Sequence, residues 1–311
     1  SLSIRSQRRA ERQAAKRPPG RPAARCGPAV QNVPHRVPPR PAPMPMPPRL
    51  FAAWCLALVL PALAPQAATA ADPPPRCDRP FTLALHDHGL LYDAQTGEGI
   101  DRDMADALQQ RSGCKFNVSL MPRARIWQLI ESGLLDFSLS GITNPARDKF
   151  ASFGWYFSNR YHLLVRKDAN VQQLADFERN PALRLGVIRS FRYSPRANQL
   201  VDTLDAQGRV SQASALAPLY QVLLDNRVQA MIIEPFDYPA LENARIRAAT
   251  TLLEFDDPPV PHGLIMSRAA LPPDQQQAWR GLVDAMRADG TVTRIFEKYF
   301  RPELARQLTR F

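Results

Sequence analysis

The stretch SGLLDFSLSGITNPAR, residues 132–147, contains a helix end, a short strand and a polar loop. The apolar spacing predicts a helix over residues 124–132, and Gly133 is a typical residue just past a helix end. Residues 135–139 then have the apolar character of a buried strand. The loop over 140–147 carries hydroxyl, amide and guanidinium groups, and loops at the carboxyl ends of parallel strands point such groups into a crevice.

The same alternation of strands and helices continues on both sides of this stretch. Strands separated by helices of about ten residues indicate a parallel sheet with helices on its faces. The pattern is interrupted once and then repeats, which predicts two α/β lobes around a cleft. We expect strands at 81–85, 116–120, 135–139, 161–165, 184–188, 230–233 and 262–266, and helices at about 100–112, 124–132, from about 197, 216–226, 275–287 and 292–300.

The charge of the chain is concentrated at its amino-terminal end. The formal net charge is +11 over 311 residues, but residues 1–50 alone hold eleven Arg and Lys side chains and one acid, Glu11. The remainder is close to neutral, so a nucleic acid partner is not expected. The first fifty residues also hold twelve prolines and cannot bury a core. We expect residues 1–49 to be a disordered or mis-assigned extension, with the true start at Met44 or Met46; the alternative is a basic arm that binds nucleic acid.

Residues 50–70 have the features of a secretory signal peptide. Arg49 precedes the apolar run LFAAWCLALVL at 50–60, and Ala68-Thr69-Ala70 has the small-x-small pattern of a cleavage site. The run is too short for a membrane-spanning helix, which needs about 20 apolar residues. We expect a secreted, periplasmic protein that is not membrane-spanning and begins near Ala71.

Two cysteines then remain, Cys77 and Cys114. In an exported protein a lone pair predicts a disulfide rather than a metal site. The pair flanks one strand–helix unit, whose ends can lie close together. Two independent thiols are the alternative.

Four segments carry a resemblance to a known family: GIDRDMADAL at 99–108, SGLLD with SGITNPAR across 132–147, NRVQAMIIEP at 226–235, and ADGT through IFEKYF across 288–300. In this order they resemble the periplasmic solute-binding proteins of ABC importers, in particular the amino-acid-binding group, family 3, with the type II periplasmic-binding fold. The resemblance implies an α/β fold with two mostly parallel sheets and two hinge crossings. Lobe 1 would comprise 77–166 plus 263–311 and lobe 2 would comprise 167–262, closing on a ligand by a hinge motion.

The resemblance assigns the ligand's carboxylate to Arg147, whose planar fork can donate two parallel hydrogen bonds. Ser140, Gly141 and Thr143 would complete this site, with the Thr143 hydroxyl assisting Arg147 and Gly141 allowing close approach of the backbone. The loop is one residue shorter than the family pattern. The alternatives are a surface arginine paired with Asp148 or Asp136, and an ordinary polar turn.

The remaining ligand contacts also follow from the resemblance. Glu234 stands where the family has an aspartate for the ligand's ammonium group, and its alternative is a carboxylate facing water. Tyr92 stands where an aromatic ring covers the ligand, or it is ordinary packing. Arg123 would favour a ligand with an extra negative charge, or belongs to a solvated helix start. Ser190 and Phe191 replace a Gly-Thr/Ser-Thr pattern, which points away from a standard α-amino acid.

The function implied is capture, without chemistry, of a small carboxylate-bearing ligand by a monomer that delivers it to ABC permease subunits. Neither a cofactor nor a metal is expected, because the histidines are scattered and His86-x-His88 lacks a clear third ligand. A dehydratase-like enzyme on the same fold is one alternative, with Glu234 as general acid. A ligand-sensing subunit for a receptor is another.

Overall fold

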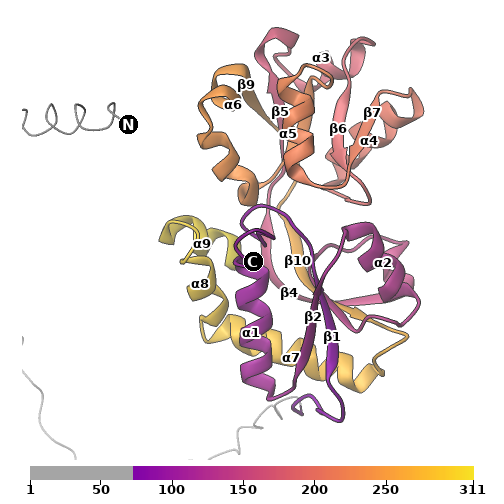
Figure 1. Ribbon diagram of the computed structural model, residues 1–311, viewed down its shortest axis with the longest axis vertical. Coiled ribbons are helices and arrows are strands. Elements are labelled where there is room, and N and C mark those ends of the chain that lie inside the picture. Colours follow the sequence, from indigo (N-terminus) through magenta and orange to yellow (C-terminus); the bar gives the residue numbers. More distant parts are fainter. Residues whose placement is uncertain (1–72) are drawn as a thin grey trace, which may run out of the picture. The chain divides into compact units, whose positions relative to one another are not determined.

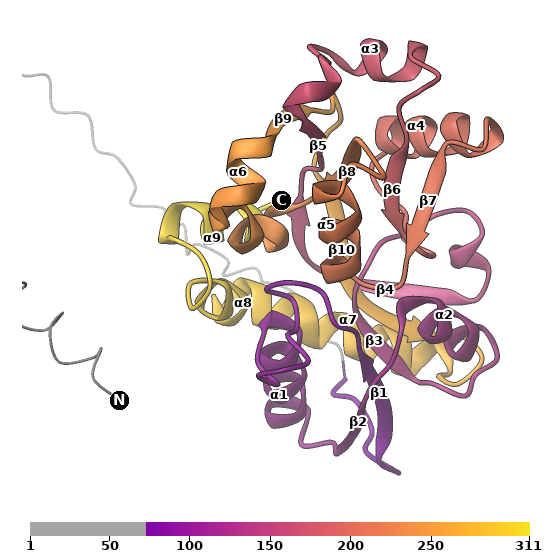
Figure 2. The same cartoon turned by 45° about the horizontal axis from the view of Figure 1, so that its top comes forward.

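The computed structural model describes residues 73–311, drawn in Figures 1 and 2. The expected extension over 1–49 and the expected signal peptide over 50–70 lie outside the described residues. No helix within 73–311 combines the length and the apolarity that a bilayer span requires.

The first sheet is built from the two ends of the described chain. Its strands are β1 (Phe81–Leu85), β2 (Phe116–Leu120), β3 (Phe137–Gly141), β4 (Ala151–Asn159) and β10 (Val260–Ser267). Their order is β2-β1-β3-β10-β4. Strand β1 pairs in parallel with β2 and β3, as the helical connections require, whereas β10 runs antiparallel to β3 and β4.

The second sheet repeats this plan with the middle of the chain. Its strands are β5 (His162–Arg166), β6 (Leu185–Ile188), β7 (Val210–Ala213), β8 (Ala230–Ile233) and β9 (Thr250–Glu254). Their order is β7-β6-β8-β5-β9. Strands β6, β7 and β8 are parallel, and β5 runs antiparallel to β8 and β9. The fold is therefore the expected two-lobed α/β arrangement, with a mixed sheet in each lobe.

Helices flank both sheets. In Figures 1 and 2, α1 and α7 lie beside the first sheet and α4 and α5 beside the second. The α-helices are α1 (Ile100–Ser112), α2 (Arg123–Glu131), α3 (Leu174–Arg179), α4 (Pro195–Ala206), α5 (Leu216–Leu224), α6 (Ala244–Ala249), α7 (Pro273–Ala288), α8 (Thr291–Phe296) and α9 (Pro302–Thr309). Short 3-10 helices are η2 (Arg147–Lys149), η3 (Lys167–Ala169) and η4 (Pro235–Glu242).

The chain crosses between the lobes earlier than we expected. We assigned 77–166 to lobe 1, but β5 pairs with β8 and β9 and so belongs to the second sheet. The return also comes earlier than residue 263, because β10 already pairs with β4 from Val260, opposite Asn159. The crossings therefore lie at 160–161 and 255–259. Apolar pattern alone locates a strand but does not show which sheet contains it.

The core of the first lobe follows the apolar spacing of the sequence. Ile100, Met104 and Leu108 on α1 are fully buried, and Gly113 ends that helix with a φ of 73°. Trp279 from α7 packs against Phe81 with ring centroids 5.6 Å apart. These contacts fix α1 and α7 against the sheet whose loops carry the candidate site.

The expected disulfide joins Cys77 to Cys114, with a Cα–Cα distance of 5.0 Å. Cys77 precedes β1 and Cys114 follows α1, so the bond closes the first strand–helix unit of the lobe.

Candidate ligand-binding cleft

A small cavity lies where the loops of both lobes meet. Its volume is about 20 Å³, which is room for about one water molecule, so the two lobes are in close contact around it. It is lined by Leu91, Arg123, Trp127, Ser140, Gly141, Ile142, Arg147, Tyr161, Ser190, Phe191, Arg192, Glu234 and His262.

Most of the residues expected to contact a ligand come together here. The lining includes Ser140, Gly141, Arg147, Arg123, Glu234, Ser190 and Phe191. It does not include Thr143 or Tyr92. Six further residues were not expected: Leu91, Trp127, Ile142, Tyr161, Arg192 and His262.

Arg147 connects the two lobes. Its Nη1 donates to the carbonyl oxygen of Ile142 at 3.1 Å, and its Nη2 donates across the cleft to the carbonyl oxygen of Ser190 at 2.8 Å. The guanidinium carbon lies 4.0 Å from the centre of the Trp127 ring, a cation–π contact. Burial, and then the nearby charge of Arg123, lower the pKa of Arg147 to about 9. A side chain only 8% exposed is not the surface arginine of the alternative reading.

The acids that might have paired with Arg147 have other partners. Asp136 forms a bidentate ion pair with Arg79, in which Nη1 donates to Oδ2 at 2.8 Å and Nη2 donates to Oδ1 at 2.5 Å. Asp148 accepts from the hydroxyl of Thr143, which is exposed and so does not assist Arg147. The side chain of Asn144 accepts from the backbone N–H of Arg147 at 2.9 Å. In this shortened loop, Asn144 rather than Thr143 positions the arginine.

Tyr92 lies beside the cavity without lining it. It is half-buried and packs against the core of the first lobe, and its carbonyl oxygen accepts from the backbone N–H of His88 at 2.8 Å. The neighbouring Leu91 lines the cavity instead. The aromatic rings that line the cavity are those of Trp127, Tyr161 and Phe191, and the Phe191 ring stacks on His88 with centroids 5.0 Å apart.

Arg123 is a second buried guanidinium in the lining. It is 6% exposed, which excludes the solvated helix start that was its alternative. Its Nη1 donates to the carbonyl oxygen of Leu139 at 3.0 Å, and its Nη2 lies 3.4 Å from Nε2 of His86. Burial, followed by the charge of Arg123, lowers the pKa of His86 well below its usual range, so the neutral ring can accept at Nε2. Arg123 also lies over Phe191, 5.7 Å from the ring centre.

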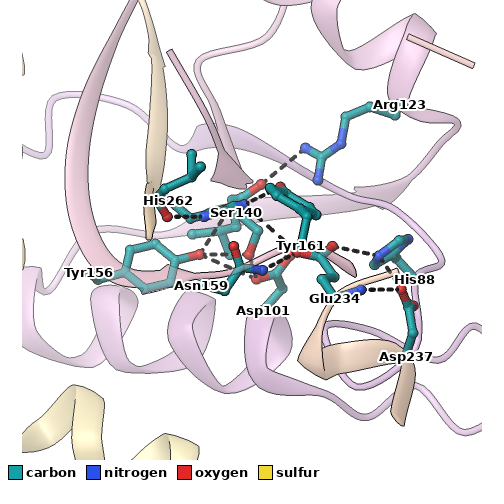
Figure 3. A network of polar contacts seen from close by, with 12 residues as sticks. His88, Asp101, Arg123, Ser140, Tyr156, Asn159, Tyr161, Glu234, Asp237 and His262 are labelled. Atoms are coloured by element: carbon teal, nitrogen blue, oxygen red, sulfur yellow. Dashed lines mark hydrogen bonds and ion pairs between the residues drawn. The ribbon is translucent and has the colours of Figure 1, made fainter. Parts of the chain in front are cut away.

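Glu234 is buried at the end of β8 and is not the water-facing carboxylate of its alternative reading (Figure 3). Its Oε1 lies 2.9 Å from Nε2 of His88, and Asn159 Nδ2 donates to its Oε2. Burial alone acts to raise the pKa of Glu234, but the bond from His88 and other contacts hold it below its usual value. Burial acts to lower the pKa of His88, and the carboxylates of Asp237 and Glu234 outweigh it. We interpret the pair as carboxylate and imidazolium, with a contact that crosses from one lobe to the other.

Tyr161, at the first crossing, and His262, on β10, form a neutral pair (Figure 3). Nδ1 of His262 lies 2.9 Å from the carbonyl oxygen of Val260, which can only accept, so this nitrogen carries the proton. Nε2 therefore accepts from the Tyr161 hydroxyl at 2.9 Å. Burial lowers the pKa of His262 to about 4, which keeps the ring uncharged.

Ser140 and Gly141 occupy the end of β3, where the backbone turns. Ser140 has a φ of 54°, and its hydroxyl donates to Oδ1 of Asp101 at 2.6 Å. A Cβ on Gly141 would lie 2.2 Å from Cγ1 of Ile265, so packing against β10 requires a glycine here. The structure thus gives Gly141 a packing reason, and the expected close approach to a ligand stays a prediction for a residue that lines the cavity.

One group of side chains in residues 73–311 has donor atoms placed as a metal could use them: His88, Glu234 and Asp237, within 4.8 Å of one another. His86 is not part of this group, and the two other members, Glu234 and Asp237, come from lobe 2. The same spacing fits a charged His88 held between two carboxylates, with Nε2 at 2.9 Å from Glu234 and 3.6 Å from Asp237. Within residues 73–311, Nδ1 of His88 and Oδ1 of Asp237 have no hydrogen-bond partner.

Asp101 provides a pH-dependent test of the network under the cleft. Burial raises the pKa of this carboxyl to about 6, despite donors from Ser140 and Tyr156. A raised folded-state pKa means that stability is greatest below the unfolded value and falls as pH rises through about 6. A shift from 3.8 to about 6 corresponds to about 3 kcal/mol at most.

For Asp101→Asn, we therefore expect a stability close to the wild type at pH 4 and a growing advantage up to about pH 6.5. Asparagine keeps the oxygen that accepts from Ser140 and carries no charge. Urea unfolding of both proteins across this range measures the difference. A constant difference at all pH values would contradict the assignment.

Comparison with known proteins is consistent with this architecture. Residues 86–302 match the family described as bacterial extracellular solute-binding proteins, family 3. The arginine-binding extracellular protein ArtP of Bacillus subtilis is 27% identical over 139 residues, 44% of this chain. The match spans only about half of that relative, 52% of its length.

Solved structures with the same fold include two amino-acid-binding proteins. The arginine-, lysine-, histidine-binding protein ArtJ of Geobacillus stearothermophilus has a TM-score of 0.60 at 16% identity, over 74% of this chain and 100% of that one. The ancestral amino acid-binding protein AncCDT-1, a precursor of cyclohexadienyl dehydratase, has a TM-score of 0.57 at 20% identity, over 71% and 95% of the two chains. Because the family match covers most of the chain and the two-lobed fold agrees with it, this protein belongs to the bacterial extracellular solute-binding proteins of family 3.

Proposed function

We propose that this protein captures a small carboxylate-bearing ligand in the periplasm and delivers it to the permease of an ABC importer. It acts as a monomer and performs no chemistry on the ligand. The observation that carries the proposal is Arg147, a buried guanidinium in the cavity lining whose donors reach backbone carbonyls of both lobes. A carboxylate entering an open cleft would take the place of these carbonyls, because a guanidinium bonds an ionised acceptor more strongly than a neutral one.

Closure of the lobes around the ligand is part of the proposal. Polar contacts cross between the lobes, among them those from Arg147 to Ser190, from His88 to Glu234 and from Asn159 to Glu234. Two short crossings connect the lobes, and such connections allow a hinge motion. A ligand that binds both lobes would favour the closed arrangement by its extra affinity for that state.

Calorimetric titration with a panel of small carboxylic acids tests the proposal. We expect at least one acid to bind with one-to-one stoichiometry and to be recovered unchanged. At about a hundred times its Kd it should stabilise the fold by about 2.7 kcal/mol. If no carboxylate in the panel binds, the proposal is wrong; if the acid is converted to a product, the protein is an enzyme. Uptake of the same acid should be lost in cells that lack the protein.

A further inference from the structure

The cavity lining carries an excess of positive charge. Three guanidinium groups, of Arg123, Arg147 and Arg192, line it together with one carboxylate, Glu234. Arg192 has its own counter-ion, because its Nη1 and Nη2 lie 2.9 and 3.0 Å from the two oxygens of Asp202. The charge that a ligand meets therefore depends on Arg123 and Arg147.

Within the described part of the chain, neither Arg123 nor Arg147 forms an ion pair. Arg123 donates to a carbonyl and lies against a neutral histidine ring, and Arg147 donates to two carbonyls. Both side chains are more than nine-tenths buried. Two buried guanidinium groups facing one cavity repel each other, and the charge of Arg123 is one cause of the lowered pKa of Arg147. Burial still lowers the pKa of Arg123, although Asp101 and Glu234 act on it with the opposite sign, and neither acid forms an ion pair with it. A negatively charged ligand in the cavity would pair both guanidinium groups, and buried charges are stable only when paired.

The one carboxylate in the lining is already compensated. Each oxygen of Glu234 has a donor, His88 at Oε1 and Asn159 at Oε2. Against the effect of burial, the carboxylates of Asp237 and Glu234 raise the pKa of His88, and burial raises the pKa of Asp237 to about 7, so the charge of His88 is set against that of Glu234. Asp101 is buried with Ser140 and Tyr156 as donors and does not line the cavity, although its charge acts on Arg123. An ammonium group on a ligand would therefore meet guanidinium groups and no uncompensated carboxylate.

We propose that the ligand of this cleft is a small dicarboxylate without an ammonium group, one acid group bonded to Arg147 and the other to Arg123. This inference rests on the proposed function and specifies its ligand class. A dicarboxylate ligand would set this protein apart from relatives named for binding arginine. The cationic side chain of a bound arginine would add a third positive charge beside Arg123 and Arg147.

A comparison of matched ligands on the wild-type protein tests this directly. Glutarate, glutaramate and glutamate share one carbon chain and differ in one acid or one ammonium group. We expect glutarate to bind about ten-fold or more tightly than either of the others, a difference of about 1.4 kcal/mol. Arginine should not compete. Inorganic sulfate serves as the dianion with a single centre, and binding of sulfate as tight as that of glutarate would contradict two separate acid sites.

A variant then assigns the second acid group. Arg123→Gln should bring the affinities for glutarate and glutaramate close together, because the group that distinguishes them is gone. The matched control is Arg125→Gln, an exposed arginine two residues away on α2, which should keep the wild-type preference. Thermal unfolding checks that both variants fold. If Arg123→Gln does not fold, the comparison of ligands on the wild-type protein still tests the dicarboxylate proposal.

The outcomes separate the two proposals. If glutamate or arginine binds more tightly than glutarate, the dicarboxylate inference is wrong while carboxylate capture stands. If Arg123→Gln folds and still prefers glutarate, the assignment of Arg123 is wrong. If none of these acids binds but a monocarboxylate of the wider panel does, only the dicarboxylate inference is wrong; if no acid of the panel binds, both proposals are wrong.

Discussion

Replacing Arg147 with alanine should raise the Kd for the carboxylate ligand by about 30-fold or more, because truncating one partner of a buried charge pair typically costs 2–5 kcal/mol. The substitution removes the proposed carboxylate site and also the bond from lobe 1 to the carbonyl oxygen of Ser190. The fold should remain, since the partners lost are two carbonyls and the face of Trp127. Calorimetry measures the affinity, and circular dichroism with thermal unfolding measures the fold.

Two controls make this result specific. Arg147→Lys keeps the charge but not the planar fork, so its affinity should lie between those of the wild type and the alanine variant. Arg125→Ala removes an exposed arginine from α2 and should bind as the wild type does. If Arg147→Ala binds the ligand with the affinity of the wild type, the assignment of Arg147 as the central residue of the site is wrong.

Removing the disulfide should have the largest effect on stability. The bond joins residues 37 apart, and loops of this length are typically stabilised by about 3–4 kcal/mol when closed. The variant with Cys77→Ser and Cys114→Ser should therefore unfold at a clearly lower urea concentration than the wild type. Neither cysteine lines the cavity, so ligand affinity of the folded protein should be unchanged.

The wild type unfolded in the presence of a reductant provides the matched control for the disulfide. It should lose as much stability as the double variant, and the reductant should not alter the variant further. If both proteins unfold at the same urea concentration without reductant, the bond contributes nothing.

Much of the fold could be predicted because its signals are local. Apolar spacing placed α1, and Gly113 marked its end. The crossings could not be placed in this way, because β5 is an apolar strand in either lobe and only its pairing with β8 and β9 decides. Sheet membership depends on contacts between distant segments, which a pattern along the chain does not contain.

The candidate site shows the same division. Arg147 and Glu234 follow predicted strands and were found from the motifs around them. Tyr161, at the first crossing, and His262, on β10 just after the second, were missed because they reach the cleft only after both lobes have folded. Had the crossings been placed correctly, the tyrosine and the histidine beside them would have been candidate cleft residues. The burial of Asp101 was not predicted either, because an acid in a first helical turn normally faces water and this one is 1% exposed.

The structure of the complex with the tightest-binding dicarboxylate tests the central claim most directly. One carboxylate should lie between the lobes with its two oxygens within hydrogen-bond distance of Nη1 and Nη2 of Arg147. A ligand bound elsewhere, or an Arg147 that turns away from it into solvent, would contradict the account.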